Sequence, residues 1–231
     1  MNTDQAPPAN QISLIGEIAS EAIFSHDVYG EKFYNFDLLV PRLSDATDLL
    51  PITISDRIME GNTIPSKIDR GTDHGLNFDR NCYSFEPGQL IKLEGQIRSY
   101  NSYVESQGRS KLMLTTFVKD YEFLDEFGRQ NPNDVMLDGY VCKPPVYRTT
   151  PFGREITDIL LAVNRSYNKS DYIPCITWGR NARYASKLAV GENVKIWGRM
   201  QSRIYQKKLE DETIVEKTAY EVSVSRLEKN I

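Results

Sequence analysis

The feature that most limits the fold is an internal repeat. Four landmarks of the first half recur at one offset, 139 − 16 = 123 positions later. The pairs are Gly16 and Gly139, Gly30 and Gly153, Arg42 and Arg165, and Pro51 and Pro174. Further on, residues 88–95 (GQLIKLEG) match 191–198 (GENVKIWG) at an offset of 191 − 88 = 103. Two copies of about 100 residues each are predicted, since this is an ordinary domain size.

Strand patterns are clearest in the second copy. Residues 193–205 alternate with a period of two, as successive side chains on a strand do. A helix is predicted over 181–189, where Gly191 is placed to end it. The other predicted strands are 134–147 (broken by Pro144 and Pro145), 154–164, 172–178 and 215–227. Three strands, one helix and two strands is the order of a five-stranded OB barrel. We therefore expect an all-β fold with short helices, made of two tandem five-stranded OB-fold barrels.

The repeat also gives domain boundaries. Because 123 − 103 = 20, the first copy carries about 20 extra residues, which fall in a stretch rich in turn formers. The expected segments are a flexible N-terminus (1–11), a first OB fold (12–124) with an insertion at about 58–86, a linker (125–133) and a second OB fold (134–231). The helix of the first copy, near residues 55–60, is predicted to be short or displaced by the insertion.

Charge is divided unevenly between the copies. The total of −4 separates into 12 Lys+Arg against 20 Asp+Glu in residues 1–133, or −8, and 16 against 12 in residues 134–231, or +4. Binding responds to the local field rather than to the total. The second copy is therefore the expected contact surface for a polyanion.

Several classes of protein are excluded by residue content. Three distant cysteines and two histidines make a zinc site or a disulfide framework unexpected. No apolar run approaches a membrane span, and the N-terminus lacks a signal-peptide pattern, so we expect a cytoplasmic protein without membrane contact. The acidic residues are scattered, which disfavours a metal-dependent nuclease. No enzyme activity, metal or cofactor is expected.

The residues of one face of 193–205 alternate between cationic and aromatic types. Lys195, Trp197, Arg199, Arg203 and Tyr205 share that face, whereas Val194 and Ile196 lie on the core side. Cations attract phosphates and rings stack on bases, so this face suits single-stranded nucleic acid.

Four segments of the second copy resemble the bacterial single-stranded DNA-binding protein family. They are 147–156 (YRTTPFGREI), 161–165 (LAVNR), 172–180 (YIPCITWGR) and 198–205 (GRMQSRIY). The match runs in order, with similar spacing, over nearly all of 134–228. The resemblance implies a non-enzymatic binder of single-stranded DNA with little sequence preference, acting in replication, recombination or repair. The alternative is an OB-fold protein-interaction module, such as a primosome accessory subunit, with incidental nucleic-acid contact.

The resemblance also assigns residues. Stacking on bases is expected from Tyr167, Tyr172, Trp178, Trp197 and Tyr205. A cationic groove is expected from Arg148, Arg154, Arg165, Arg180, Arg199, Arg203 and Lys207. Two alternatives stay open: Trp178 fits a lid on the core, and Trp197 fits a subunit interface. Family members with two barrels per chain pair into dimers with four OB folds, so the likeness implies a homo-oligomer.

Two departures from the family pattern matter. The chain stops at Ile231, directly after the last predicted strand, whereas relatives continue into an acidic tail that recruits enzymes; no general recruiting role is expected, and protein partners stay unknown. In the first copy the offsets replace the rings by Ser44, Leu49, Ser55 and Ser102. We therefore expect the first barrel to bind DNA weakly or not at all.

Overall fold

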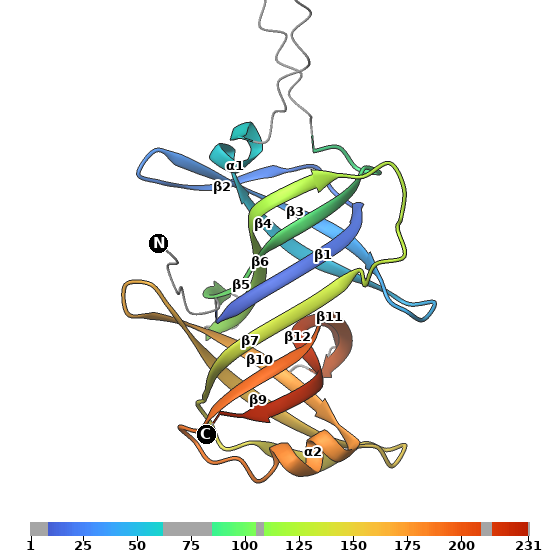
Figure 1. The fold of residues 1–231 in the computed structure, drawn as a ribbon, viewed down its shortest axis with the longest axis vertical. Helices are drawn as coiled ribbons and strands as arrows, with labels where there is room; N and C mark the ends of the chain where they lie inside the picture. Colours follow the sequence, from blue (N-terminus) through green and yellow to red (C-terminus); the bar gives the residue numbers. More distant parts are fainter. Residues whose placement is uncertain (1–8, 62–84, 105–108, 209–213, 231) are drawn as a thin grey trace, which may run out of the picture.

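Two β-barrels lie one above the other along the long axis of the molecule (Figure 1). The structure is a computed structural model that describes residues 9–61, 85–104, 109–208 and 214–230. The predictions for the N-terminal lead-in and for most of the insertion, residues 1–8 and 62–84, therefore fall outside the described residues. Neither described helix is long and apolar enough to cross a membrane.

The first barrel contains six strands and one helix of the described chain. They are β1 (Asn10–Ile18), β2 (Ile23–Val28), β3 (Glu31–Pro41), β4 (Thr47–Ser55), α1 (Asp56–Gly61), β5 (Leu90–Val104) and β6 (Arg109–Phe123). Neighbouring strands pair in the circular order β1, β5, β6, β4, β3 and back to β1, with β2 added at the edge of β3. The β4–β6 pairing is parallel.

The second barrel repeats this arrangement. Its elements are β7 (Asn133–Val141), β8 (Val146–Thr149), β9 (Glu155–Arg165), β10 (Lys169–Trp178), α2 (Gly179–Ala185), β11 (Asn193–Lys208) and β12 (Ile214–Lys229). The circular order is β7, β11, β12, β10, β9 and back to β7, with β8 beside β9. The predicted fold class, all-β with two tandem five-stranded OB barrels, is confirmed.

Some predicted elements have different bounds. The strand predicted over 134–147 is two strands, β7 and β8, since the residues between them include Pro144 and Pro145, which cannot donate to a ladder. The helix predicted over 181–189 begins earlier and ends at Ala185. The short helix of the first copy is present as α1.

The glycines that mark the repeat stand where two backbones meet closely. A Cβ on Gly198 would lie 2.2 Å from the carbonyl oxygen of Ser223, and one on Gly95 would lie 2.3 Å from that of Phe117. Both glycines follow a shift of register, between Trp197 and Gly198 and between Glu94 and Gly95. The sequence landmark therefore records a bulge that no larger residue fits.

A local twofold axis relates the barrels. Strand β1 pairs antiparallel with β7, and Ile12 lies opposite Val135. These two residues are equivalents in the repeat, since 135 − 12 = 123. Residues that are equivalent and directly opposed must lie about a twofold axis. The pairing joins both barrels into one sheet of twelve strands.

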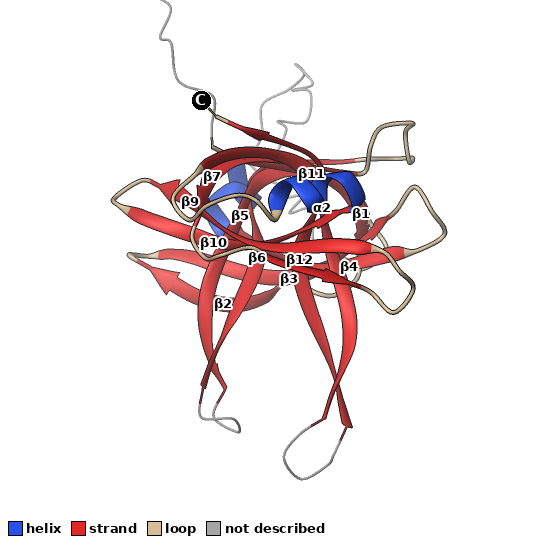
Figure 2. Ribbon diagram, turned by 90° about the horizontal axis from the view of Figure 1, so that it is seen from below, coloured by secondary structure: helices blue, strands red, loops and turns tan. Residues whose placement is uncertain are grey.

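Two long hairpins extend from the same side of the molecule (Figure 2). We call the outer part of β5–β6 (98–104 and 109–115) the first arm, and that of β11–β12 (201–208 and 214–221) the second arm. Each arm contacts the opposite barrel: Ser99 reaches Tyr172 on β10, and Ser202 reaches Leu49 on β4. Lys111 Nζ donates to the carbonyl oxygen of Thr218 at 3.2 Å, so the arms also touch each other.

Candidate nucleic-acid interface

The outward face of β9 and β10 carries exposed rings. Along β10 the side chains of Ile173, Cys175 and Thr177 are buried, whereas Tyr172 is 46% and Trp178 is 38% exposed. The inner side chains line the barrel core, and Ile176, which has the same parity as Tyr172 and Trp178, is buried as well. The rings are turned outward and are not covered by the neighbouring barrel. A Trp178 side chain that served only to cover the core would be more deeply buried than this.

Tyr167 lies in the turn between β9 and β10. It has φ 62°, and Asn168 follows with φ 54°. Left-handed backbone at two successive residues reverses the chain tightly. The Tyr167 side chain is 93% exposed, so its ring is open to solvent at this end of the face.

Trp178 owes its position to the glycine behind it. Gly179 has φ 54°, a conformation that suits glycine, and it opens α2 directly after β10. The abrupt change from strand to helix leaves the indole at the edge of the outward face. Arg180 follows within α2 and is exposed.

Three of the predicted cations surround this face. Arg148 on β8 forms an ion pair with Asp158 on β9, with Nε 2.9 Å from Oδ2. Arg154 lies in the β8–β9 turn, where its backbone N–H donates to Thr150 Oγ1. Within the described part of the chain, neither Arg154 nor Arg180 has an ion-pair partner. Both side chains are exposed to solvent.

Sequence reasoning did not select two side chains that meet at Glu155 of β9. Tyr147 Oη donates to Glu155 Oε1 at 2.6 Å, and Arg183 pairs with the other oxygen of Glu155 at 3.0 Å. The hydrogen bond to Glu155 raises the pKa of Tyr147. No signal in the sequence marks Arg183, because its contact with Glu155 of β9 forms only when α2 packs against the end of the barrel.

The predicted residues on β11 do not join the rings of β10. Strand β12 lies between β11 and β10. Trp197 is flanked by Arg226, whose Cζ lies 4.5 Å from the ring centroid, and by Lys195 at 5.5 Å. It lies opposite Met136 of β7, on the outward side of the sheet shared by both barrels.

The other β11 residues lie on the second arm. Arg203 is held over the Tyr205 ring and 3.5 Å from Glu221. Both follow Ser202, the residue that contacts the first barrel. Lys207 lies further out on the same strand, and its side chain is outside the described part.

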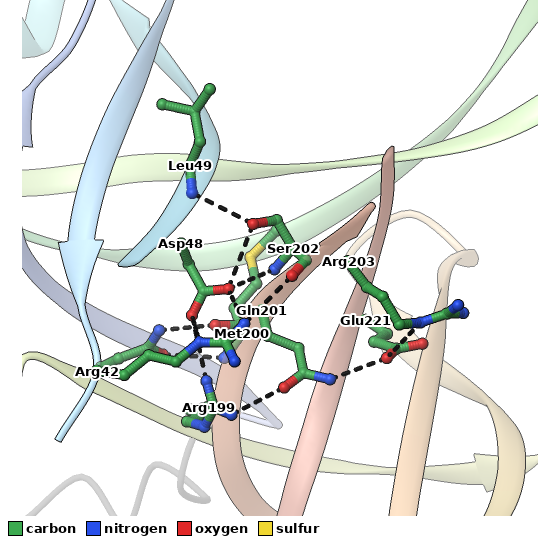
Figure 3. Close-up of polar contacts among 10 residues, drawn as sticks. Arg42, Asp48, Leu49, Arg199, Met200, Gln201, Ser202, Arg203 and Glu221 are labelled. Carbon is green, nitrogen blue, oxygen red and sulfur yellow. Dashed lines mark hydrogen bonds and ion pairs between the residues drawn. The ribbon is translucent and has the colours of Figure 1, made fainter. Parts of the chain in front are cut away.

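Arg199 belongs to a buried ion cluster between the barrels, which we call the Asp48 clamp (Arg42, Asp48, Arg199 and Ser202; Figure 3). Asp48 is fully buried and accepts two hydrogen bonds from Arg42, at 2.8 and 2.6 Å. Across the interface Arg199 Nη1 donates to it at 3.2 Å, and the backbone N–H of Ser202 at 2.8 Å. The Ser202 hydroxyl in turn accepts from the backbone N–H of Leu49 at 3.2 Å.

Arg165 belongs to the twofold-related cluster, the Asp171 clamp (Arg98, Ser99, Arg165 and Asp171). Asp171 is 1% exposed and accepts from Arg98 Nη1 at 3.2 Å and from the backbone N–H of Ser99 at 2.9 Å. Arg165 Nη1 lies 3.7 Å from the same carboxylate. Sequence reasoning missed Arg98 and Ser99. The other two members, Arg165 and Asp171, could have been found, because the repeat matches them with Arg42 and Asp48 of the other clamp.

Burial acts on the guanidinium groups of both clamps. It lowers the pKa of Arg199, with a further decrease from the Arg42 charge, while Asp48 opposes both. Burial likewise lowers the pKa of Arg98, and Asp171 opposes it. Arginine is effectively always protonated in proteins, so both groups keep their charge. Arg165 and Arg199 thus form ion pairs at the barrel interface rather than presenting free cations to solvent.

Known proteins resemble the chain in both sequence and fold. The model of the single-strand binding protein family matches residues 132–229, the second barrel. Single-stranded DNA-binding protein B of Bacillus subtilis (strain 168) is 36% identical over 84 residues, which are 32% of this chain and 72% of that protein. Single-stranded DNA-binding protein 1 of Staphylococcus aureus (strain COL) is 37% identical over 81 residues, which are 32% of this chain and 48% of that protein. The chain thus spans about half the length of the Staphylococcus aureus relative.

The fold of the whole chain has a counterpart among solved structures. The wild-type single-stranded DNA binding protein from Thermus aquaticus superimposes with a TM-score of 0.68 over 96% of this chain and 93% of that one, at 20% identity. This likeness concerns the fold and includes both barrels. The sequence evidence, by contrast, comes from the second barrel. On the family model and the relative of which it covers 72%, the chain belongs to the single-strand binding protein family.

Proposed function

We propose that the chain binds single-stranded DNA, with little sequence preference, through the outward face of β9 and β10. The observation that carries the proposal is the pair of exposed rings on one strand, Tyr172 and Trp178. Two exposed arginines of the same barrel, Arg154 and Arg180, have no carboxylate partner among the described residues. Rings accept any base, and cations neutralise the phosphates between them. The relatives are named for this activity, and we infer a role in replication, recombination or repair.

The binding chemistry needs no covalent step, so we propose a binder rather than an enzyme. Tyr167, Tyr172 and Trp178 would each stack on one base. Stacking contributes about 1–3 kcal/mol per base, and three bases together contribute about 6 kcal/mol. That free energy corresponds to a dissociation constant of roughly tens of micromolar. One face alone is therefore a modest binder.

A second copy of the chain is the proposed source of further affinity. A strand that reaches two such faces gains through effective concentration. The outward side of the shared sheet, where Trp197 lies opposite Met136, is the surface we assign to that contact. Light scattering should then give twice the chain mass of 26.5 kDa.

Titration with oligo-dT tests the proposal. Both tryptophans lie in the second barrel, so intrinsic fluorescence reports on it. We expect quenching that weakens as salt rises, because phosphate contacts release counterions, and little response to duplex DNA. An unchanged fluorescence and no binding by anisotropy would contradict the proposal and favour a protein-interaction module.

A further inference from the structure

The two clamps have the same geometry but hold different side chains. In each, a serine of one arm donates its backbone N–H to a buried aspartate of the opposite barrel and accepts a backbone N–H with its hydroxyl. Ser202 of the second arm accepts from Leu49 at 3.2 Å, whereas Ser99 of the first arm accepts from Tyr172 at 2.7 Å. The first barrel therefore fixes the backbone of a ring that belongs to the second.

The first arm also carries a ring of its own on the side that faces the second barrel. Pairing of β5 with β6 is regular from Gly95 to Val104, so Ser99 and Tyr103 lie on the same side of the strand. Tyr103 is 65% exposed. Since a strand rises about 3.3 Å per residue, the ring is about 13 Å beyond the contact with Tyr172, which is within reach of a few nucleotides.

Charge on the first arm suits a polyanion as well. Arg98 faces Asp171 with one nitrogen and Gln96 with the other, at 3.2 and 2.6 Å. Together with Arg165 the cluster has two cations and one carboxylate, a net charge of +1 beside Tyr172. Of these groups only Arg98 lies on the first arm, but residues 98–104 and 109–115 also include Arg109 and Lys111 and contain no Asp or Glu, so the overall acidity of the first half does not extend to this arm.

We infer that the DNA site of the second barrel is completed by the first arm, in which Ser99 positions Tyr172 and Tyr103 adds a stacking ring. The inference rests on the proposed function. It gives the first barrel a part in binding although its own β4 has Leu49 in place of Tyr172 and Ser55 in place of Trp178.

The repeat provides matched controls for a test. Ser202 is the equivalent of Ser99, and Gln206 is the equivalent of Tyr103, because 206 − 103 = 103. The experiment measures the dissociation constant of a fluorescein-labelled dT oligomer by anisotropy for the full chain and for six variants. The variants are Tyr103→Ala, Gln206→Ala, Ser99→Ala, Ser202→Ala, Ser99→Thr and Tyr172→Ala.

Tyr103→Ala should weaken binding about tenfold by loss of one stacked base, without changing the salt slope. Gln206→Ala should have no effect. Ser99→Ala should weaken binding about threefold, the usual size for one lost hydrogen bond, and Ser99→Thr should restore it. Ser202→Ala should bind like the unmodified chain even though it loses the same bond.

Tyr172→Ala in the same series separates the inference from the function on which it rests. If Tyr172→Ala weakens binding while Tyr103→Ala and Ser99→Ala do not, the proposed function stands and the inference is wrong. Equal losses of affinity in Ser99→Ala and Ser202→Ala would show that both clamps act only through the stability of the fold, and would overturn the positioning role of Ser99. If the unmodified chain does not bind the oligomer, both proposals fail. Tyr103 is exposed, so its variant stays informative even where a clamp variant fails to fold.

Discussion

The outward faces of the two barrels differ at equivalent positions of one repeated framework. On the second barrel β9 and β10 bear Leu160 and Tyr172, whereas the first has Asp37 and Leu49 at those positions (160 − 37 = 123 and 172 − 49 = 123). The buried parts are alike: each barrel has a clamp aspartate, a bulge glycine and a closing strand pair. Contacts that hold the barrels together have been kept in both copies, while the exposed faces have diverged.

Arginines serve two different purposes in the two barrels: some hold the barrel interface together, and others are open to phosphates. Arg165 and Arg199 come from the same motifs as the exposed arginines, yet both face a buried carboxylate. Removing one partner of a buried ion pair leaves the other uncompensated. We therefore assign these two mainly to the interface, and Arg154 and Arg180 to phosphate.

The largest expected effect is a loss of DNA affinity when the rings that distinguish the second barrel are removed. Replacing Tyr172 and Trp178 together by Ala should remove about 4 kcal/mol of binding, nearly a thousandfold in the dissociation constant for oligo-dT. Leu49→Ala, the matched change on the first barrel, should leave the constant unchanged. Anisotropy titration measures both. A double variant that binds within threefold of the original would place the site elsewhere.

The two clamps should contribute equally to the free energy of unfolding but unequally to DNA binding. Asp48→Asn and Asp171→Asn should each lower the free energy of unfolding by about 3 kcal/mol, since each leaves two guanidinium groups without their carboxylate. Urea denaturation measures this loss. Of the two, Asp171→Asn should also weaken DNA binding, because it loosens the neighbour of Tyr172. Equal binding by both variants would contradict the asymmetry.

A smaller effect concerns salt. Arg154→Ala with Arg180→Ala should reduce the slope of log affinity against log salt by about 1.4, at about 0.7 per phosphate contact on a single strand. Affinity measured at several salt concentrations gives the slope. If the slope keeps its value in this double variant, the phosphates run along other cations.

The smallest effect lies on the first barrel. Burial raises the pKa of Asp37 above its ordinary value. The folded chain then holds this proton more tightly than the unfolded chain, so stability falls as pH rises from the ordinary value through the raised one. Asp37→Asn should therefore be more stable than the original at pH 7, by less than about 1 kcal/mol because the group keeps much of its water. The difference should vanish in acid, below the ordinary aspartate pKa, where the original is also neutral; thermal unfolding across pH measures it.

Much of the fold could be predicted from the sequence, because the repeat and the period of two are local patterns. Gly95 and Gly198 mark the bulges, and the family resemblance placed Tyr172 and Trp178 on the third strand of the second copy, which is β10. The clamps could not be predicted in full, since Arg98 meets Asp171 only when the first arm crosses to the other barrel. The prediction that Trp197 and Tyr205 share one groove with Tyr172 rested on the family resemblance and, for residues 193–205, on strand parity, and parity does not say which neighbour a barrel strand faces.

Photo-crosslinking with an oligonucleotide that carries iodouracil tests the central claim most directly, because it marks the rings that stack on bases. Peptide mass spectrometry of the crosslinked chain should find adducts at Tyr172 or Trp178 on β10, and none on β3 or β4 of the first barrel. Adducts on Phe24 of β2, which is 54% exposed, or on its neighbour Tyr34 of β3, with β10 unmarked, would contradict the account.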